Sequence, residues 1–375
     1  MICEKNKCTG CFACYNICPV SAIVMKEDLY GNIYPKVNKD KCISCGLCKK
    51  ICPQINSKTV FIKPLNVYAM YSKNFEIRKH SSSGGIATII SEKIINEGGV
   101  VYGAANLFDK KSFSFLRIDK IEDLYKLKGS KYVHCYINDT FRKVKKDLEL
   151  NIKVLFIGTP CQIAGLLSFL KKKYDNLITI DLICHGVSSQ KLLFEEFKEF
   201  KINEYHYITF RDIDGFGIKV YSNYNNYKNN RVYKKINLDN DFYMKNFLDG
   251  NIFRKNCYSC SYAQTNRISD ITLGDFWGLN KKSNIYDNEN KGISLVISTT
   301  LKGNKIIEDI MNDVKWEKRN IIEAVNGNKQ LKKPSKKRFF YYIYYTLYPI
   351  LDYKYTSRLI MSIRKFKSKL RKFLK

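Results

Sequence analysis

Eight cysteines near the start of the chain form two copies of one pattern, C-x2-C-x2-C-x3-C-P. The first copy contains Cys8, Cys11, Cys14 and Cys18, and the second contains Cys42, Cys45, Cys48 and Cys52. This spacing is typical of two-cluster bacterial ferredoxins, in which three thiolates of a run bind one 4Fe–4S cluster and the fourth ligates the other. The sequence therefore predicts one cluster bound by Cys8, Cys11, Cys14 and Cys52, and another bound by Cys42, Cys45, Cys48 and Cys18.

Two other kinds of site also use closely spaced cysteines. A structural zinc site needs only four cysteines in two pairs, and a disulfide framework is typical of secreted chains. Duplicated runs that each end before a proline favour the clusters, because proline pushes the preceding residue into an extended conformation that points away from the loop. Cys3 lies outside both runs and is expected to be a spectator.

Length and composition leave most of the chain to be explained. The 375 residues suffice for two or three domains, of which residues 1–56 would be the ferredoxin-like one. The cluster ligands follow Met1 without an apolar signal segment, and fourteen cysteines with free thiolates need a reducing compartment, so we expect a cytoplasmic protein. The formal net charge of +30 is spread over a chain rich in Lys throughout and indicates little unless it is concentrated.

A Ser/Gly turn precedes a predicted helix in the next part of the chain. Apolar periodicity predicts this helix over residues 85–96, with strands over 67–71 and 100–104. Amides at such a helix N-terminus suit a phosphate group, although an ordinary helix cap explains the same residues equally well. The turn residues are Ser83, Gly84 and Gly85. A second polar segment near a turn contains Lys128, Ser130 and Lys131.

A strand–turn–helix–strand unit follows. Strands are predicted over residues 154–157 and 177–183, with a helix over 161–170 between them. A parallel crossover of this kind places the carboxyl ends of both strands at one edge of the sheet, where open α/β sheets bind ligands. The residues that we expect to meet there are Cys161, Cys184 and His185.

A later C-x2-C pair needs two more ligands to complete a metal site. We predict a third 4Fe–4S cluster held by Cys161, Cys184, Cys257 and Cys260, with Cys135 as the spare candidate. The alternatives are a structural zinc ion, a redox-active Cys161 thiolate at a helix N-terminus, and plain buried thiols. His185 is a candidate proton donor beside Cys184, although an isolated histidine is more often structural.

The order of these motifs resembles the coenzyme F420 hydrogenase/dehydrogenase beta-subunit family. The resemblance covers about residues 67–300 and rests on SSGG, GGVVYGAA, KGSKYV, VLFIGTPCQIAGLLSFL, DLICHGVSS, FRD, CYSCSYA and RISDITLGDFWG. It implies an α/β region, 67–150 and 151–325, that binds FAD and a 4Fe–4S cluster. Relatives with a fused ferredoxin include reductases of chlorophyll intermediates and bacterial proteins associated with polysaccharide synthesis, which this chain resembles most. The acceptor varies within the family, so coenzyme F420 itself is not assumed.

The resemblance also implies the residues around the cofactors. The flavin would be surrounded by Ser83, Gly84, Gly85, Lys128, Ser130, Lys131, Thr159 and Gln162. The later cysteines would hold the family's cluster, and Cys161 and His185 would lie at the edge where a substrate reacts. A flavin suits this scheme because it accepts single electrons and delivers a hydride.

The C-terminal tail, residues 331–375, is the concentrated part of the basic charge, with fourteen Lys or Arg against one acid, Asp352. It begins with an uncharged, Tyr-rich run over 339–351 and is not part of the family pattern. Beyond that run, one helical face collects Leu359, Ile363, Phe366, Leu370 and Phe373. A basic amphipathic helix of this kind favours an anionic membrane surface. The alternative is a helix docked on the protein's own core, and we expect no nucleic acid.

The predicted fold is an α+β ferredoxin-like N-terminal domain, an α/β flavin-binding catalytic region and a basic helical tail. The first functional hypothesis is a cytoplasmic iron–sulfur flavoprotein reductase, peripheral at the inner face of the cell membrane. It would take electrons from a ferredoxin or from a reduced flavin or deazaflavin carrier, and reduce a small or lipid-linked substrate in polysaccharide biosynthesis. The second is an electron-transfer subunit without a substrate of its own, and the third is a homologue that has lost its flavin.

Overall fold

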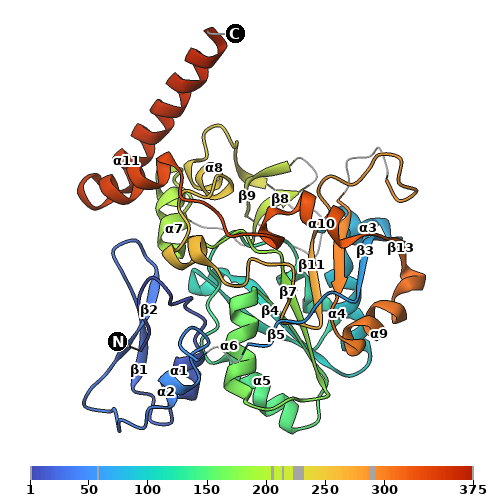
Figure 1. Cartoon of the computed structure of the whole chain (residues 1–375). Helices are drawn as coiled ribbons and strands as arrows, with labels where there is room; N and C mark the ends of the chain where they lie inside the picture. Colours follow the sequence, from blue (N-terminus) through green and yellow to red (C-terminus); the bar gives the residue numbers. More distant parts are fainter. Residues whose placement is uncertain are drawn as a thin grey trace.

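The computed structural model of the chain describes residues 2–56, 59–203, 207–212, 215–222, 232–286 and 292–373. Its largest element is a mixed sheet with the strand order β13-β3-β12-β11-β7-β6-β4-β5 (Figure 1). The strands are β3 Asn66–Ser72, β4 Val100–Leu107, β5 Ser112–Ile118, β6 Val154–Gly158, β7 Leu177–Leu182, β11 Ile271–Asp275, β12 Ser294–Ser298 and β13 Val314–Lys318.

The centre of the large sheet is parallel. Strands β4, β6, β7 and β11 run in the same direction, whereas the strands at both flanks are antiparallel to their neighbours. Val154 pairs with Leu177 and Gly158 with Asp181, so the predicted crossover from β6 to β7 is confirmed. The carboxyl ends of the four parallel strands therefore lie along one edge of the sheet, which is the usual ligand edge of such folds.

Helices cover both faces of this sheet. Along β6, Val154 and Phe156 belong to the core beneath α5 and α6, whereas Leu155 belongs to the core beneath α4 and α9. This alternation follows from the two-residue period of a strand, and burying each such side chain contributes about 1.5–3 kcal/mol. The α-helices are α3 Phe75–Lys79, α4 Ile86–Asn96, α5 Thr140–Glu149, α6 Pro160–Leu170, α7 Gln190–Glu199, α9 Leu301–Asp309 and α10 Ile321–Gly327. The 3-10 helices are η1 Phe108–Lys110, η2 Ile121–Leu127, η3 Lys255–Ser259, η4 Met311–Asp313 and η5 Lys329–Leu331.

A second, smaller sheet lies beside α8 and has the strand order β10-β9-β8. Its strands are all antiparallel to their neighbours. The elements are β8 Tyr207–Asp212, β9 Gly215–Tyr221, β10 Val232–Ile236 and α8 Phe242–Leu248.

The N-terminal part packs against the side of the large sheet that carries α5 and α6 (Figure 1, blue beside green). It contains an antiparallel hairpin and two short helices: α1 Ala13–Ile17, β1 Ile23–Glu27, β2 Ile33–Val37 and α2 Leu47–Lys50. Arg142 Nε donates to the Asn16 carbonyl at 2.7 Å, and Ser168 Oγ donates to the Ile51 carbonyl at 2.5 Å. Side chains of α5 and α6 thus hold the N-terminal part in place.

The C-terminal helix α11, Phe339–Phe373, is broken at Asp352, whose φ of 58° and ψ of −172° are not helical. Tyr344 and Tyr348 before the break, and Tyr353 and Ile360 after it, are buried in the protein's own core. Core docking, the alternative to membrane binding, therefore holds for the helix as far as Ile360. The last turns project from the body (Figure 1, red), and Phe366 is 66% exposed. No helix in the described ranges is both long and apolar enough to span a bilayer.

Candidate iron–sulfur and flavin site

Five cysteines of the N-terminal part line one cavity, and we call the four that belong to the two runs the middle set: Cys8, Cys11, Cys14 and Cys52. Burial raises the pKa of Cys11 to about 11. Burial also raises the pKa of Cys14 well above its usual value, and the nearby thiols of Cys11, Cys8 and Cys52 add to this shift. The last cysteine of the second run thus joins the first three of the first run, as the crossed ferredoxin pattern predicts.

The remaining cysteines of the two runs form the surface set: Cys18, Cys42, Cys45 and Cys48. Cys42 and Cys45 are exposed, whereas Cys18 and Cys48 are partly buried. Burial raises the pKa of Cys48, and the neighbouring thiols of Cys45 and Cys18 raise it further. Cys18 of the first run thus lies near Cys45 and Cys48 of the second, as the predicted crossing requires, and the exposed Cys42 and Cys45 lie where a partner molecule can reach them.

Four cysteines from distant parts of the chain form the sheet-edge set: Cys161, Cys184, Cys257 and Cys260. Cys161 is in the first turn of α6, Cys184 follows β7, and the other two lie in and directly after η3. Desolvation by the surrounding protein raises the pKa of Cys161, and the Cys184 and Cys260 thiols add to it. Desolvation raises the pKa of Cys257 to about 12, and Cys260 and Cys161 again contribute. The fold thus brings together the four residues that we predicted from sequence.

The middle and sheet-edge sets are neighbours. A Cβ atom at Gly165 in α6 would lie 2.9 Å from Cys11 Cβ, so only glycine allows α6 to approach Cys11 this closely. Tyr262 lies between the sets: burial raises its pKa, and the thiols of Cys161 and Cys11 raise it further. The Tyr262 hydroxyl also accepts a hydrogen bond from Gln54 Nε2 at 3.1 Å. The middle and sheet-edge sets are therefore close to one another in the fold.

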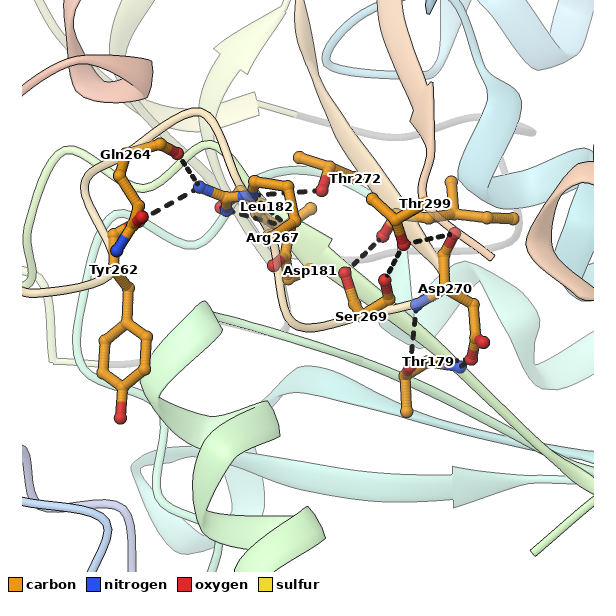
Figure 2. Close-up of polar contacts among 11 residues, drawn as sticks. Thr179, Asp181, Leu182, Tyr262, Gln264, Arg267, Ser269, Asp270, Thr272 and Thr299 are labelled. Atoms are coloured by element: carbon orange, nitrogen blue, oxygen red, sulfur yellow. Dashed lines mark hydrogen bonds and ion pairs between the residues drawn. The ribbon is translucent and has the colours of Figure 1, made fainter. Parts of the chain in front are cut away.

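Arg267 holds the loop that follows the C-x2-C pair (Figure 2). Its side chain is 3% exposed, and Nη2 donates at 2.9 Å to Asp181 Oδ1, which belongs to β7 three residues before Cys184. Its Nη1 donates at 3.1 Å to each of the Tyr262 and Gln264 carbonyls. One buried ion pair thus ties the loop after Cys260 to the strand before Cys184.

The alternatives to a 4Fe–4S cluster at the sheet-edge set are a zinc ion, a reactive Cys161 thiolate and plain buried thiols. Within the described part of the chain, no three His, Cys, Asp or Glu side chains converge on a point that suits a single metal ion. A 4Fe–4S cube separates its ligand sulfurs more widely than one zinc ion does, because its irons lie between them. The raised pKa of Cys161 is the reverse of what a reactive thiolate needs. The spare candidate, Cys135, directs its thiol to the Val133 carbonyl.

The two segments predicted to surround a flavin meet in the structure. The Ser130 N–H donates to Ser82 Oγ at 2.7 Å, which joins the segment after η2 to the Ser/Gly turn. Gly85, with φ +86°, is the N-cap of α4, and no side chain caps this helix. Ser83 Oγ is buried and has no hydrogen-bond partner among the residues that the structure describes. An uncapped helix N-terminus beside an unpartnered hydroxyl fits the phosphates of a dinucleotide such as FAD.

The two lysines of this region have different surroundings. Burial lowers the pKa of Lys131 to about 8, and its ammonium group donates to the Leu127 and Lys128 carbonyls at 2.8 and 2.7 Å. It thereby closes the end of η2. Burial lowers the pKa of Lys128, and nearby Glu92 opposes this shift. Contact of either lysine with a flavin stays a prediction.

Thr159 and Gln162 form a capping box at the start of α6. Gln162 Oε1 accepts a hydrogen bond from the Thr159 N–H at 2.9 Å, and Gln162 Nε2 donates to the Cys135 carbonyl at 2.9 Å. Thr159 Oγ1 lies 3.2 Å from Cys161 Sγ. These side chains position the helix that presents Cys161, and their role at a flavin stays a prediction.

His185 lies at the same edge, directly after Cys184. It is exposed, yet desolvation by the surrounding protein lowers its pKa and nearby Asp275 opposes the shift. Arg211 Nη1 donates to Asp275 Oδ2 at 2.5 Å, and its guanidinium lies 5.4 Å from the Trp277 ring centre. A solvent-accessible imidazole beside a carboxylate can supply a proton to a molecule bound here.

Sequence patterns missed three residues of these sites. Cys3, expected to be a spectator, lines the cavity of the middle set, where burial and then nearby Cys52 raise its pKa to about 12. Tyr262 lies between two sets, and Arg254 is buried three residues before Cys257. None of them belongs to a repeated spacing, so only adjacency to a cysteine motif could have drawn attention to them.

Comparisons with known proteins agree with the motifs. Residues 152–324 match the family described as the C terminus of the beta subunit of coenzyme F420 hydrogenase/dehydrogenase, and residues 7–55 match the 4Fe-4S dicluster domain. A chain of the F420-reducing nickel–iron hydrogenase complex from Methanosarcina barkeri is 17% identical, with a TM-score of 0.46, and the match covers 74% of this chain and 98% of that one. No curated protein matches the sequence. The chain is thus an iron–sulfur protein related to the beta subunits of coenzyme F420 hydrogenases and dehydrogenases, and it carries a 4Fe–4S dicluster domain before the matched residues 152–324.

Proposed function

We propose that the chain is an iron–sulfur flavoprotein oxidoreductase that reduces a small or lipid-linked substrate with electrons from an external carrier. The observation that carries the proposal is the order of the cysteine sets. Cys42 and Cys45 of the surface set are exposed, and Cys18 and Cys48 of that set share a hydrophobic cluster with Cys14 of the middle set. The sheet-edge set adjoins both the middle set and the ligand edge of the parallel strands. This order supports a path from the protein surface to a ligand at the sheet edge.

Each part of the chain has a defined task in this proposal. The three cysteine sets would hold 4Fe–4S clusters, which transfer single electrons, and the turn before α4 would hold FAD, which converts single electrons to hydride chemistry. Gly165 keeps two sets close, and Arg267 keeps the sheet-edge set assembled. His185, beside Asp275, supplies a proton to the substrate.

The surface around the surface set supports an acidic electron carrier, such as a ferredoxin, as the donor. Residues 36–50 contain one acid, Asp40, and five exposed lysines: Lys36, Lys39, Lys41, Lys49 and Lys50. Positive charge around an exposed redox site steers an acidic partner toward it and accelerates the encounter.

Anaerobic purification followed by iron, sulfide and flavin analysis tests the proposal. We expect about twelve irons and one FAD per chain, with four irons for each cluster. A count of about eight irons would mean that the sheet-edge set binds no cluster and that the other two sets do. Iron without flavin would contradict the flavoprotein and favour a homologue that has lost this cofactor.

An electron-transfer subunit of a larger complex is the second candidate, because the matching family model describes a beta subunit. The enzyme predicts that the isolated chain, reduced with dithionite, turns over a substrate bound at the sheet edge. The electron-transfer role predicts reduction of the clusters and flavin without turnover. The resemblance of the ordered motifs to polysaccharide-associated relatives makes lipid-linked sugars the first substrates to test.

The projecting end of α11 supports a peripheral membrane contact in this proposal. Phe366 is 66% and Leu370 48% exposed on a segment rich in Lys and Arg. We expect Phe366→Glu to reduce binding to phosphatidylglycerol-containing vesicles at least tenfold in a sedimentation assay. Leu301→Glu, at an 83% exposed position in α9, is the matched control and should bind like the unaltered chain. Equal binding by both variants would exclude the membrane contact.

A further inference from the structure

Arg254 is a buried guanidinium group that contacts one cysteine set and lies near another. Its side chain is 1% exposed. Nε donates at 3.0 Å to the carbonyl of Cys8, which belongs to the middle set. Its positive charge also reaches Cys257 of the sheet-edge set, where it opposes the desolvation that raises the pKa of that thiol. Arg254 is therefore placed to act on both sets.

The two terminal nitrogens of Arg254 lack partners. Nη1 and Nη2 are both buried, and neither has a carboxylate or any other hydrogen-bond partner among the described residues. The guanidinium carbon lies 4.2 Å from the Tyr34 ring centre, a cation–π contact that leaves the N–H groups unsatisfied. Arg267, which is equally buried, has Asp181 and two carbonyls as partners. An isolated buried charge costs several kcal/mol, so the surroundings of Arg254 fit an anionic group.

We propose that Arg254 is the cation that sets the reduction potential of the clusters held by the middle and sheet-edge sets. The inference rests on the proposed function, because it requires that both sets bind 4Fe–4S clusters. Four thiolates around such a core carry net negative charge, and net charge and hydrogen bonds to the sulfurs are two of the factors that set its potential. Reduction adds one electron and no proton, so a buried cation stabilises the reduced form more than the oxidised form.

His134 cannot share this task. It is 5% exposed and lies, like Arg254, against Gly10. Burial, followed by the charge of Arg254, lowers the pKa of His134 to about 3, so its imidazole is neutral at physiological pH. Of the two buried side chains beside Gly10, Arg254 is therefore the one that carries positive charge.

A redox titration of three variants tests the proposal. The full-length chain and its variants Arg254→Lys, Arg254→Gln and Arg254→Met are purified anaerobically, analysed for iron, and reduced stepwise with dithionite while EPR follows the clusters. The Gln and Met variants lack the positive charge. In them we expect the equilibrium constant for reducing at least one cluster to fall tenfold or more, which lowers the one-electron reduction potential by about 59 mV or more. The Lys variant keeps the charge and should stay within threefold of the unaltered chain.

Arg142→Met is the matched control. Arg142 also joins the N-terminal part to the body and donates to a cysteine carbonyl, that of Cys18, at 3.0 Å. Unlike Arg254, it is exposed to solvent. Its removal should therefore leave the potentials unchanged within twofold. A shift as large as that of Arg254→Met would show that domain docking, not buried charge, controls the potential, and would overturn the proposal.

The remaining outcomes are also decisive. If Arg254→Met and Arg254→Gln lose iron while Arg254→Lys retains it, the potentials of the Lys variant decide: values within threefold of the unaltered chain support the proposal, and a larger change contradicts it. If Arg254→Lys loses iron equally, or if iron-replete Arg254→Met titrates like the unaltered chain, the proposal fails. An unaltered chain without iron would instead defeat the proposed function, so the two failures are distinguishable.

Discussion

The surface set and the sheet-edge set place the same four ligands in opposite structural contexts. The surface set comes from 31 consecutive residues, Cys18 to Cys48, and two of its members are exposed. The sheet-edge set comes from α6, the end of β7 and η3, and its assembly depends on the crossover between parallel strands and on the Arg267–Asp181 pair. Spacing within one short segment is sufficient to bring the cysteines of the surface set together, whereas the cysteines of the sheet-edge set meet only in the completed fold.

Breaking the Arg267–Asp181 pair should have the largest effect. Arg267→Met leaves the 0% exposed Asp181 without its partner, and loss of one member of a buried pair costs about 3–5 kcal/mol. Urea denaturation under anaerobic conditions measures this change. The control Lys143→Met breaks an exposed helical pair with Asp139 and should cost about 0.3–0.5 kcal/mol. A cost below about 1 kcal/mol for Arg267→Met would mean that the sheet-edge set does not depend on this pair.

Removing one ligand from each set compares the two sets directly. Cys184→Ala and Cys45→Ala should each lose about four irons per chain. We expect the thermal midpoint to fall more for Cys184→Ala, because metal binding at the sheet edge joins separate segments and its free energy contributes to folding. Iron analysis and calorimetry of both variants measure these changes. Equal midpoints would indicate that the fold holds the sheet-edge set without help from a cluster.

Reversing charge near the surface set should have the smallest effect on the fold and a kinetic effect on electron transfer. Lys39→Glu with Lys41→Glu should slow reduction by an acidic ferredoxin about tenfold at low salt, with a smaller difference at high salt. Stopped-flow absorbance measures the rate. The control pair Lys305→Glu and Lys315→Glu makes the same change in net charge at exposed positions on α9 and β13. If both double variants are slowed equally, the carrier does not dock at the surface set.

The cysteine sets were predictable from sequence because their chemistry constrains residue type and spacing. The crossing of Cys52 to Cys8, Cys11 and Cys14 follows from the ferredoxin pattern, and the structure confirms the proximity. The meeting of Cys161 and Cys184 follows from the parallel crossover. Strands β3, β4, β6 and β7 and helices α4 and α6 also appear where apolar periodicity predicted them.

Arg254 and the C-terminal helix were not predictable in the same way. An arginine in a sequence is expected at the surface. Only tertiary packing reveals that Arg254 is buried and that its terminal nitrogens have no partner in the described ranges of the chain. The uncharged run over 339–351 suits a lipid headgroup layer and a protein core equally well, because tyrosine satisfies both. The burial of Tyr344 and Tyr348, and the hydrogen bond that Tyr348 donates to the Glu195 carboxylate, decide in favour of the core.

The docked part of α11 has a consequence for how the chain is made. The Tyr30 hydroxyl donates at 2.8 Å to the carbonyl of Tyr345, 315 residues later, and the Tyr30 ring packs against the rings of Tyr345 and Tyr348. A ribosome delivers the N-terminus first, so both ferredoxin-type runs leave the exit tunnel long before the segment that clamps them exists. The cysteines of these runs can therefore bind metal before the N-terminal part is attached to α11. A chain truncated before Tyr345 would contain all the cluster ligands but would lack the contacts of Tyr30 with α11.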